Sequence, residues 1–91
     1  MSVEVRDNPD QSRFEAYVDG ELAGFAEYRR KDTTYTFTHT EVSMEGQGVG
    51  SALARQALDA VRAAGGSAVP LCPFIKGWIE KHPDYQDLVK A

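Results

Sequence analysis

The segment that most constrains the fold is EGQGVGSAL at residues 45–53, where three glycines alternate with other residues directly before an amphipathic run. Glycine loses more backbone freedom on folding than any other residue. Such a cluster therefore indicates a loop that needs positive φ angles or a close approach to a ligand. Apolar residues continue at helical spacing, which predicts a helix over residues 48–64 that ends at Gly65 and Gly66. Because helix N-termini attract anions, this arrangement favours a phosphate as the ligand.

Two common phosphate-binding loops do not fit this segment. A P-loop needs a lysine and then a serine or threonine directly after its last glycine, whereas Ser51 and Ala52 follow Gly50. A Rossmann loop needs the spacing Gly-x-Gly-x-x-Gly and an acidic residue about twenty positions later, whereas the spacing here is Gly-x-Gly-x-Gly. The segment is therefore interpreted as a phosphate loop that leads into a helix after an antiparallel run of strands.

The residues before the glycine segment predict that antiparallel run. Asp19-Gly20 lies between two alternating patterns and predicts a two-residue hairpin turn in which both residues have positive φ. Strand patterns rich in alternating, β-branched or aromatic residues occupy residues 3–6, 13–18, 21–28 and 33–42.

The last of these strands carries candidate functional side chains. Strict alternation along residues 33–42 places Tyr35, Phe37, His39 and Glu41 on one face of the strand, and the threonines and Val42 on the other. His39 and Glu41 then lie on one face, just before the glycine segment.

A short strand over residues 67–71 and a second helix complete the predicted order. Pro73 suits the first position of that helix, and Pro83 disfavours a helical conformation at His82, where the helix should stop. The order β-β-β-β-α-β-α gives an α+β fold with a mainly antiparallel sheet and helices packed on it. The length of 91 residues predicts a single domain over residues 1–91.

Charge and composition limit the partners that we expect. The net charge is −4, and the sequence has no basic stripe, so nucleic-acid binding is not expected. The sequence also has no run of about 18 apolar residues that would predict a membrane span. Cys72 is the only cysteine, which suits a reducing compartment. We therefore expect a cytoplasmic protein with no metal, membrane or nucleic-acid partner.

Several motifs together resemble one known family. The segment QGVGSAL at residues 47–53 is similar to motif A of the GCN5-related N-acetyltransferases, which binds the pyrophosphate of acetyl-CoA. The segments PLCPFI at residues 70–75, WI at 78–79 and HPDY at 82–85 resemble a minimal, single-domain subfamily of those enzymes. The resemblance covers nearly the whole chain.

This resemblance implies a reduced acetyltransferase fold and an enzyme that transfers acetyl from acetyl-CoA to an amine. The amine would be a protein lysine, a polyamine or another small amine. A non-catalytic module that binds CoA or acyl-CoA, as a sensor or an adaptor, is the alternative function. The resemblance assigns acetyl-CoA binding to the end of the last meander strand and the glycine segment, that is, to Val42, Gly46, Gln47, Gly48, Val49, Gly50 and Ser51.

Three residues are candidates for the chemistry. His39 or Glu41 could take the proton that an amine nucleophile must lose, which would support direct transfer. Cys72 precedes Pro73 at the start of the predicted second helix, a position that favours a thiolate. It would support a two-step route through an acetyl-cysteine. The sequence leaves both routes open.

Overall fold

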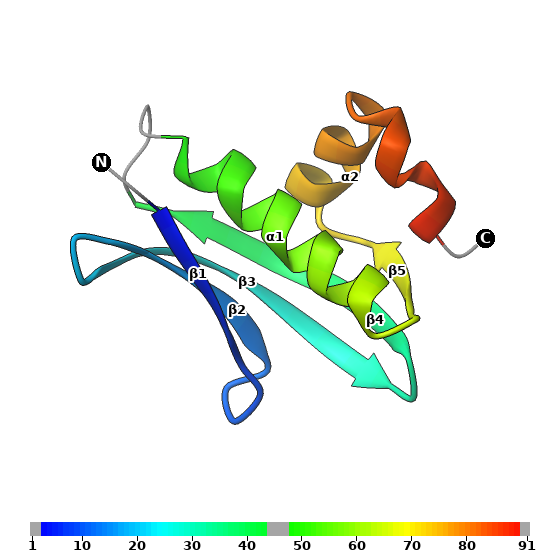
Figure 1. Cartoon of the computed structure of the whole chain (residues 1–91), viewed down its shortest axis with the longest axis horizontal. Helices are drawn as coiled ribbons and strands as arrows, with labels where there is room; N and C mark the ends of the chain where they lie inside the picture. Colours follow the sequence, from blue (N-terminus) through cyan, green and yellow to red (C-terminus); the bar gives the residue numbers. More distant parts are fainter. Residues whose placement is uncertain (1–2, 44–47, 90–91) are drawn as a thin grey trace.

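The computed structural model describes residues 3–43 and 48–89. The strands form one sheet in the order β1-β2-β3-β4-β5, which is antiparallel except for the parallel pair β4 and β5 (Figure 1). The predicted α+β class and order are confirmed, and a 3₁₀ helix (η1) is added at the C-terminal end. The elements are β1 (Val3–Asn8), β2 (Arg13–Val18), β3 (Glu21–Lys31), β4 (Thr34–Val42), α1 (Val49–Ala63), β5 (Ser67–Pro70), α2 (Pro73–Glu80) and η1 (Pro83–Leu88).

The hairpin between β2 and β3 forms as the sequence predicts. Asp19 and Gly20 separate the two strands and have φ angles of 51° and 84°. These positive values match the twist of the flanking strands. β3 continues past the predicted end at Tyr28 to Lys31, and Asp32, with φ 55°, makes the next turn.

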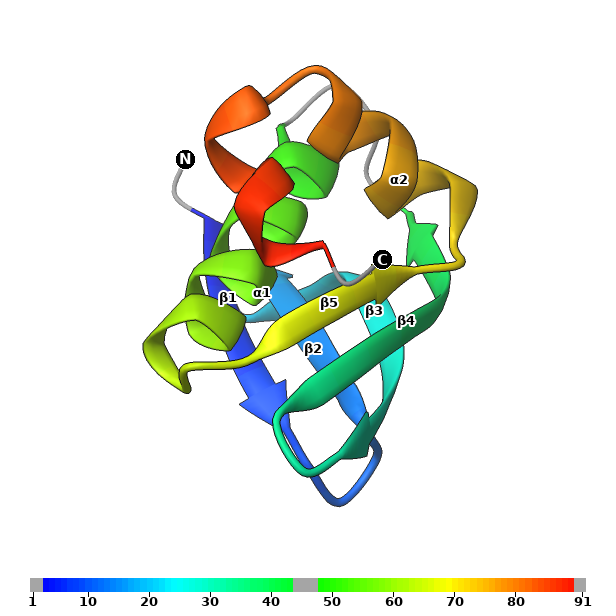
Figure 2. The same cartoon turned by 90° about the vertical axis from the view of Figure 1, so that its right-hand side faces the viewer.

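Helix α1 covers one face of the twisted sheet and contacts all five strands (Figure 2). Its predicted apolar positions are buried, and they face a layer of aromatic side chains from the sheet. Burying each large apolar side chain stabilises a fold by about 1.5–3 kcal/mol, so this layer holds the helix to the sheet. The aromatic members are Phe14, Tyr28, Tyr35 and Phe37, with neighbouring ring centroids 5.1–6.5 Å apart. None of the helices in the described ranges is long and apolar enough to cross a membrane.

A β-bulge interrupts the pairing of β4 with β3. His39 lies opposite Glu27 and Phe37 lies opposite Tyr28, although Glu27 and Tyr28 are consecutive. Thr38 is therefore an extra residue on β4. A bulge of this kind bends the strand and shifts which residues point to each face.

The bulge makes the predicted alternation of β4 wrong beyond Phe37. Tyr35 and Phe37 share one face, as predicted, and both are buried in the core. His39 and Glu41 are exposed on the opposite face of the sheet. The extra residue Thr38 shifts the alternation by one, so that each later residue of β4 points to the face opposite the predicted one. The candidate catalytic pair thus lies on the sheet face away from α1.

β5 pairs with only the first half of β4. The parallel register begins at Thr34 and ends at Phe37. The backbone N–H groups of Leu71 and Cys72 both donate to the carbonyl oxygen of Phe37, at 3.1 and 2.9 Å, and the chain then turns into α2. Among the described residues, the second half of β4 has no neighbouring strand on the β5 side.

Candidate functional site

The backbone N–H groups at the N-terminus of α1 have no side-chain cap among the described residues. The N–H groups of the first turn of any helix lack partners within the helix. The N-cap residue, Gly48, provides no side chain, no other described side chain caps this end, and the first turn contains no acidic residue. The N–H groups of Val49, Gly50 and Ser51 can therefore serve an anion, which the helix dipole also favours.

The glycines of this segment serve different purposes. Gly48 has φ +73°, and a β-carbon built on it would meet no described residue within 4 Å. A β-carbon on Gly50 would lie 2.7 Å from the ring atom Cζ of Phe74. Gly50 is therefore explained by the packing of α2 against α1, whether or not a ligand binds. The predicted ligand residues Gly46 and Gln47 lie outside the described residues.

Val42, the other predicted cofactor residue, lies at the end of β4. It is opposite Gly24 of β3 and packs, half-buried, against the core. A β-carbon on Gly24 would lie 2.8 Å from the carbonyl oxygen of Glu41, so the two strands approach closely at this end. Val42 is thus the last residue of β4 and pairs with β3 at this end of the sheet.

Cys72 is buried where β4 meets α2. It is the N-cap residue of α2 and is only 3% exposed. Its thiol donates a hydrogen bond to Oγ1 of Thr40, at 3.2 Å. Thr40 lies opposite the fully buried Ala26 of β3, which places it on the α1 side of the sheet.

His39 and Glu41 lie in contact with each other on the other side of β4. His39 Nε2 lies 3.2 Å from Glu41 Oε1, and both side chains are more than half exposed. The imidazole ring also lies 6.2 Å from the ring of Phe25, measured between centroids. Because successive strand residues point to opposite faces, this pair is on the opposite face from Thr40.

The structure therefore separates the three predicted catalytic residues into two groups. Cys72 is buried with Thr40 on the helix side of β4, and His39 and Glu41 are exposed on the open side. Sequence reasoning missed Thr40 and Phe25, the neighbours of these groups. Their contacts depend on the bulge and on strand register, which leave no local sequence signal.

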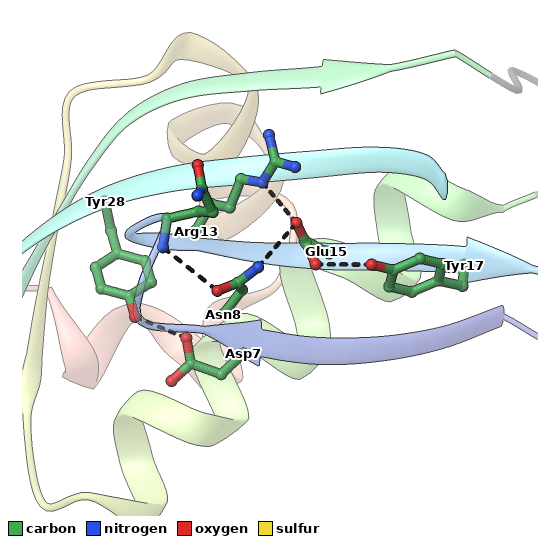
Figure 3. Close-up of polar contacts among 7 residues, drawn as sticks. Asp7, Asn8, Arg13, Glu15, Tyr17 and Tyr28 are labelled. Atoms are coloured by element: carbon green, nitrogen blue, oxygen red, sulfur yellow. Dashed lines mark hydrogen bonds and ion pairs between the residues drawn. The ribbon is translucent and has the colours of Figure 1, made fainter. Parts of the chain in front are cut away.

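The open face of the sheet has an ordered polar network. Glu15 is 6% exposed, and its carboxylate accepts hydrogen bonds from the Tyr17 hydroxyl at 2.7 Å, Arg13 Nε at 2.7 Å and Asn8 Nδ2 at 3.3 Å (Figure 3). The hydrogen bond from Tyr17, with those from Arg13 and Asn8, lowers the pKa of Glu15 against the opposing effect of burial. Arg13 also lies over the ring of Phe25, 4.7 Å from its centroid. The network thus reaches the ring beside His39.

The low pKa of Glu15 makes stability depend on pH. Its contribution to the free energy of unfolding should be complete above the ordinary glutamate pKa of 4.5, and should be lost as pH falls further through the lowered value. Glu15→Gln should cost about 1 to 3 kcal/mol at neutral pH and flatten this acid dependence. Urea unfolding between pH 3 and 7 would measure it.

Glu4→Gln is the matched control, because Glu4 makes an ion pair with Arg6 that is exposed on the neighbouring strand. Solvent screens such pairs, so this variant should change stability little. Equal acid dependence in the wild type and Glu15→Gln would contradict the role of the network.

Comparison with known proteins identifies the family of the chain. A family model described as "GCN5-related N-acetyl-transferase" matches residues 13–88, so the chain belongs to that family. Members of the family normally use acetyl-CoA as co-substrate.

One solved structure similar to the chain is the NMR solution structure of a GCN5-like candidate N-acetyltransferase from Staphylococcus aureus. The two share 26% sequence identity with a TM-score of 0.74, over 97% of this chain and 88% of that one. No curated protein matches significantly. In the described part of the chain, no group of three or more His, Cys, Asp or Glu side chains is placed to hold a metal ion.

Proposed function

We propose that this protein binds acetyl-CoA at the N-terminus of α1 and transfers the acetyl group directly to a primary amine. The observation that carries the proposal is the helix N-terminus itself. It has the left-handed Gly48 as its N-cap, no capping side chain among the described residues and no acidic residue in its first turn. Free N–H groups in that arrangement fit a pyrophosphate.

The second half of β4 suits the thioester end of such a ligand. It lacks a strand neighbour on the β5 side within the described residues. Its backbone N–H groups on that side are therefore free to donate to a thioester carbonyl, and fixed donors of this kind stabilise the oxyanion that forms in acyl transfer.

The proposed chemistry is a single acyl transfer. The amine nitrogen forms a bond to the acetyl carbonyl carbon, the carbon–sulfur bond breaks, and the thiolate of CoA leaves. His39 or Glu41 accepts the proton that the nitrogen loses. Both side chains are exposed and can meet an incoming amine.

The position of Cys72 favours direct transfer over the two-step route. An acetyl-cysteine intermediate needs a nucleophilic thiolate. The thiol is buried and donates its hydrogen bond to Thr40. The candidate bases lie across β4 on the other face, so neither is in place to take the proton from sulfur. Cys72 is better explained as a side chain that joins β4 to α2.

A small pocket beside Glu41 suits the amine. It has a volume of about 100 Å³ and lies between the start of β3 and the end of β4. Its chemistry combines one carboxylate with an aromatic ring and aliphatic surface, which fits an alkylammonium group. The residues that line it are Leu22, Gly24, Phe25, Glu41 and Ser43.

Calorimetry with acetyl-CoA, followed by turnover assays with lysine peptides, polyamines and small amines, tests the proposal. We expect saturable binding and release of CoA that depends on the amine. Binding without turnover of any amine would instead favour a non-catalytic CoA-binding module. Absence of acetyl-CoA binding would contradict both functions.

A further inference from the structure

Helix α2 contacts the first turn of α1 through one specific hydrogen bond. The indole Nε1–H of Trp78 donates to the hydroxyl oxygen of Ser51, at 3.2 Å. Trp78 is only 7% exposed, whereas Ser51 is exposed. An indole N–H can only donate, so the serine oxygen must be the acceptor. The hydroxyl hydrogen of Ser51 is then left to donate elsewhere.

We propose that Trp78 is a positioning residue that holds the Ser51 hydroxyl as a hydrogen-bond donor to the phosphates of acetyl-CoA. This inference rests on the proposed function, because it assumes that the phosphates lie at the N-terminus of α1. Ser51 is the third residue of that helix, within the first turn, which has no side-chain cap in the described part of the chain. A hydroxyl fixed as a donor there adds a charge-assisted hydrogen bond to those of the backbone.

The indole ring is held in place by the segment that follows α2. His82 stacks on Trp78 with ring centroids 3.8 Å apart and an angle of 13° between the ring planes. His82 Nδ1 lies 2.7 Å from the carbonyl oxygen of Trp78, which can only accept, so Nδ1 has the proton and donates. The indole therefore has little freedom to rotate away from Ser51.

Tyr85 and Arg62 fix the same segment further along α1. The ring of Tyr85 meets Trp78 edge-on, with centroids 5.0 Å apart, and its hydroxyl donates to Asp59 Oδ1 at 2.8 Å. Arg62 donates to both carboxylate oxygens of Asp87, at 2.9 and 3.0 Å. The aromatic residues of the HPDY segment thus support the orientation of Trp78, and a donor held by its surroundings loses less entropy on binding.

A double-mutant cycle tests the inference. Trp78→Phe keeps an aromatic ring but removes the N–H, and Ser51→Ala removes the hydroxyl. Each single variant should weaken acetyl-CoA binding about fivefold, the usual worth of one hydrogen bond. The double variant should bind no more weakly than Ser51→Ala, since the Trp78 N–H acts on the ligand only through the Ser51 hydroxyl. Calorimetry measures all four affinities.

Tyr17→Phe is the matched control. It also removes one side-chain hydrogen bond, the one that the Tyr17 hydroxyl donates to Glu15 on the sheet face away from α1, so its affinity for acetyl-CoA should stay within about twofold of the wild type. If Trp78→Phe weakens binding equally with and without the Ser51 hydroxyl, Trp78 acts only through packing and the inference is wrong. Unchanged affinity in Trp78→Phe would also overturn it.

A second measurement needs no change at position 78. Trp78 is the only tryptophan, so the indole N–H gives a single NMR signal. Saturating acetyl-CoA should shift that signal in the wild type, and the shift should be much smaller in Ser51→Ala. An indole signal that does not move when acetyl-CoA binds would contradict the inference and leave the proposed function intact. A wild type that does not bind acetyl-CoA would refute the proposed function itself.

Discussion

Gly48→Val is expected to weaken acetyl-CoA binding by about a hundredfold or more, because two or more charge-assisted hydrogen bonds to phosphate would be lost together. Gly48 has φ +73°, and no residue that the structure describes lies within 4 Å of a β-carbon built there. A β-branched residue is a genuine outlier at such an angle. The backbone would therefore shift, or the added methyl groups would occupy the approach to the N–H groups of the first turn. Calorimetry with acetyl-CoA would measure the loss.

Gly65→Val is a closely matched control, because it places the same strain at the other end of the same helix. Gly65 has φ +68°, and a β-carbon on it would also meet nothing within 4 Å. Both variants should lose similar stability on thermal unfolding, but Gly65→Val should bind acetyl-CoA like the wild type. Equal losses of affinity would point to strain in α1 as the cause. Gly50 is a poorer probe, since any side chain there collides with Phe74.

At least one of the single variants Glu41→Gln and His39→Gln should lower kcat by about a hundredfold, because one of these residues is the proposed base. Cys72→Ala should keep turnover within about threefold of the wild type. The two polar residues can act on an amine at the open face, whereas the thiol is buried with Thr40. Acetyl-CoA affinity should change little in all three variants.

Mass spectrometry separates the two routes independently. With acetyl-CoA and no amine, direct transfer predicts no added acetyl group on Cys72. A stable adduct at Cys72, together with loss of turnover in both Cys72→Ala and Cys72→Ser, would establish the two-step route instead. Thermal unfolding of each cysteine variant would exclude loss of the fold as the cause.

The sequence was sufficient for the order of elements and for the family. The Asp19-Gly20 hairpin, the helix that ends at Gly65, and the second helix that begins at Pro73 all follow from local backbone preferences. Such preferences act within a few residues, so a short window of sequence contains them. The buried side of α1 could also be predicted from the sequence, because apolar residues at helical spacing indicate which side of a helix packs against the core.

Phe74 shows where that periodicity fails. Its position on α2 predicts burial with Ile75 and Trp78, but it is 41% exposed and covers Gly50 at the start of α1. Hydrophobic spacing identifies the apolar side of a helix, whereas the extent of its coverage depends on where the neighbouring helix lies. The contact between Phe74 and Gly50 explains why a glycine is needed at position 50, since a larger residue there would collide with the ring.

Tertiary structure alone decided how the candidate catalytic residues are divided. The bulge at Thr38 arises from the register of β4 against β3, and one extra residue moved His39 and Glu41 to the open face of the sheet. Cys72 met Thr40 because β5 and α2 return to β4 after a crossover of many residues. Contacts between residues so distant in sequence depend on how whole elements pack, and no local pattern records them.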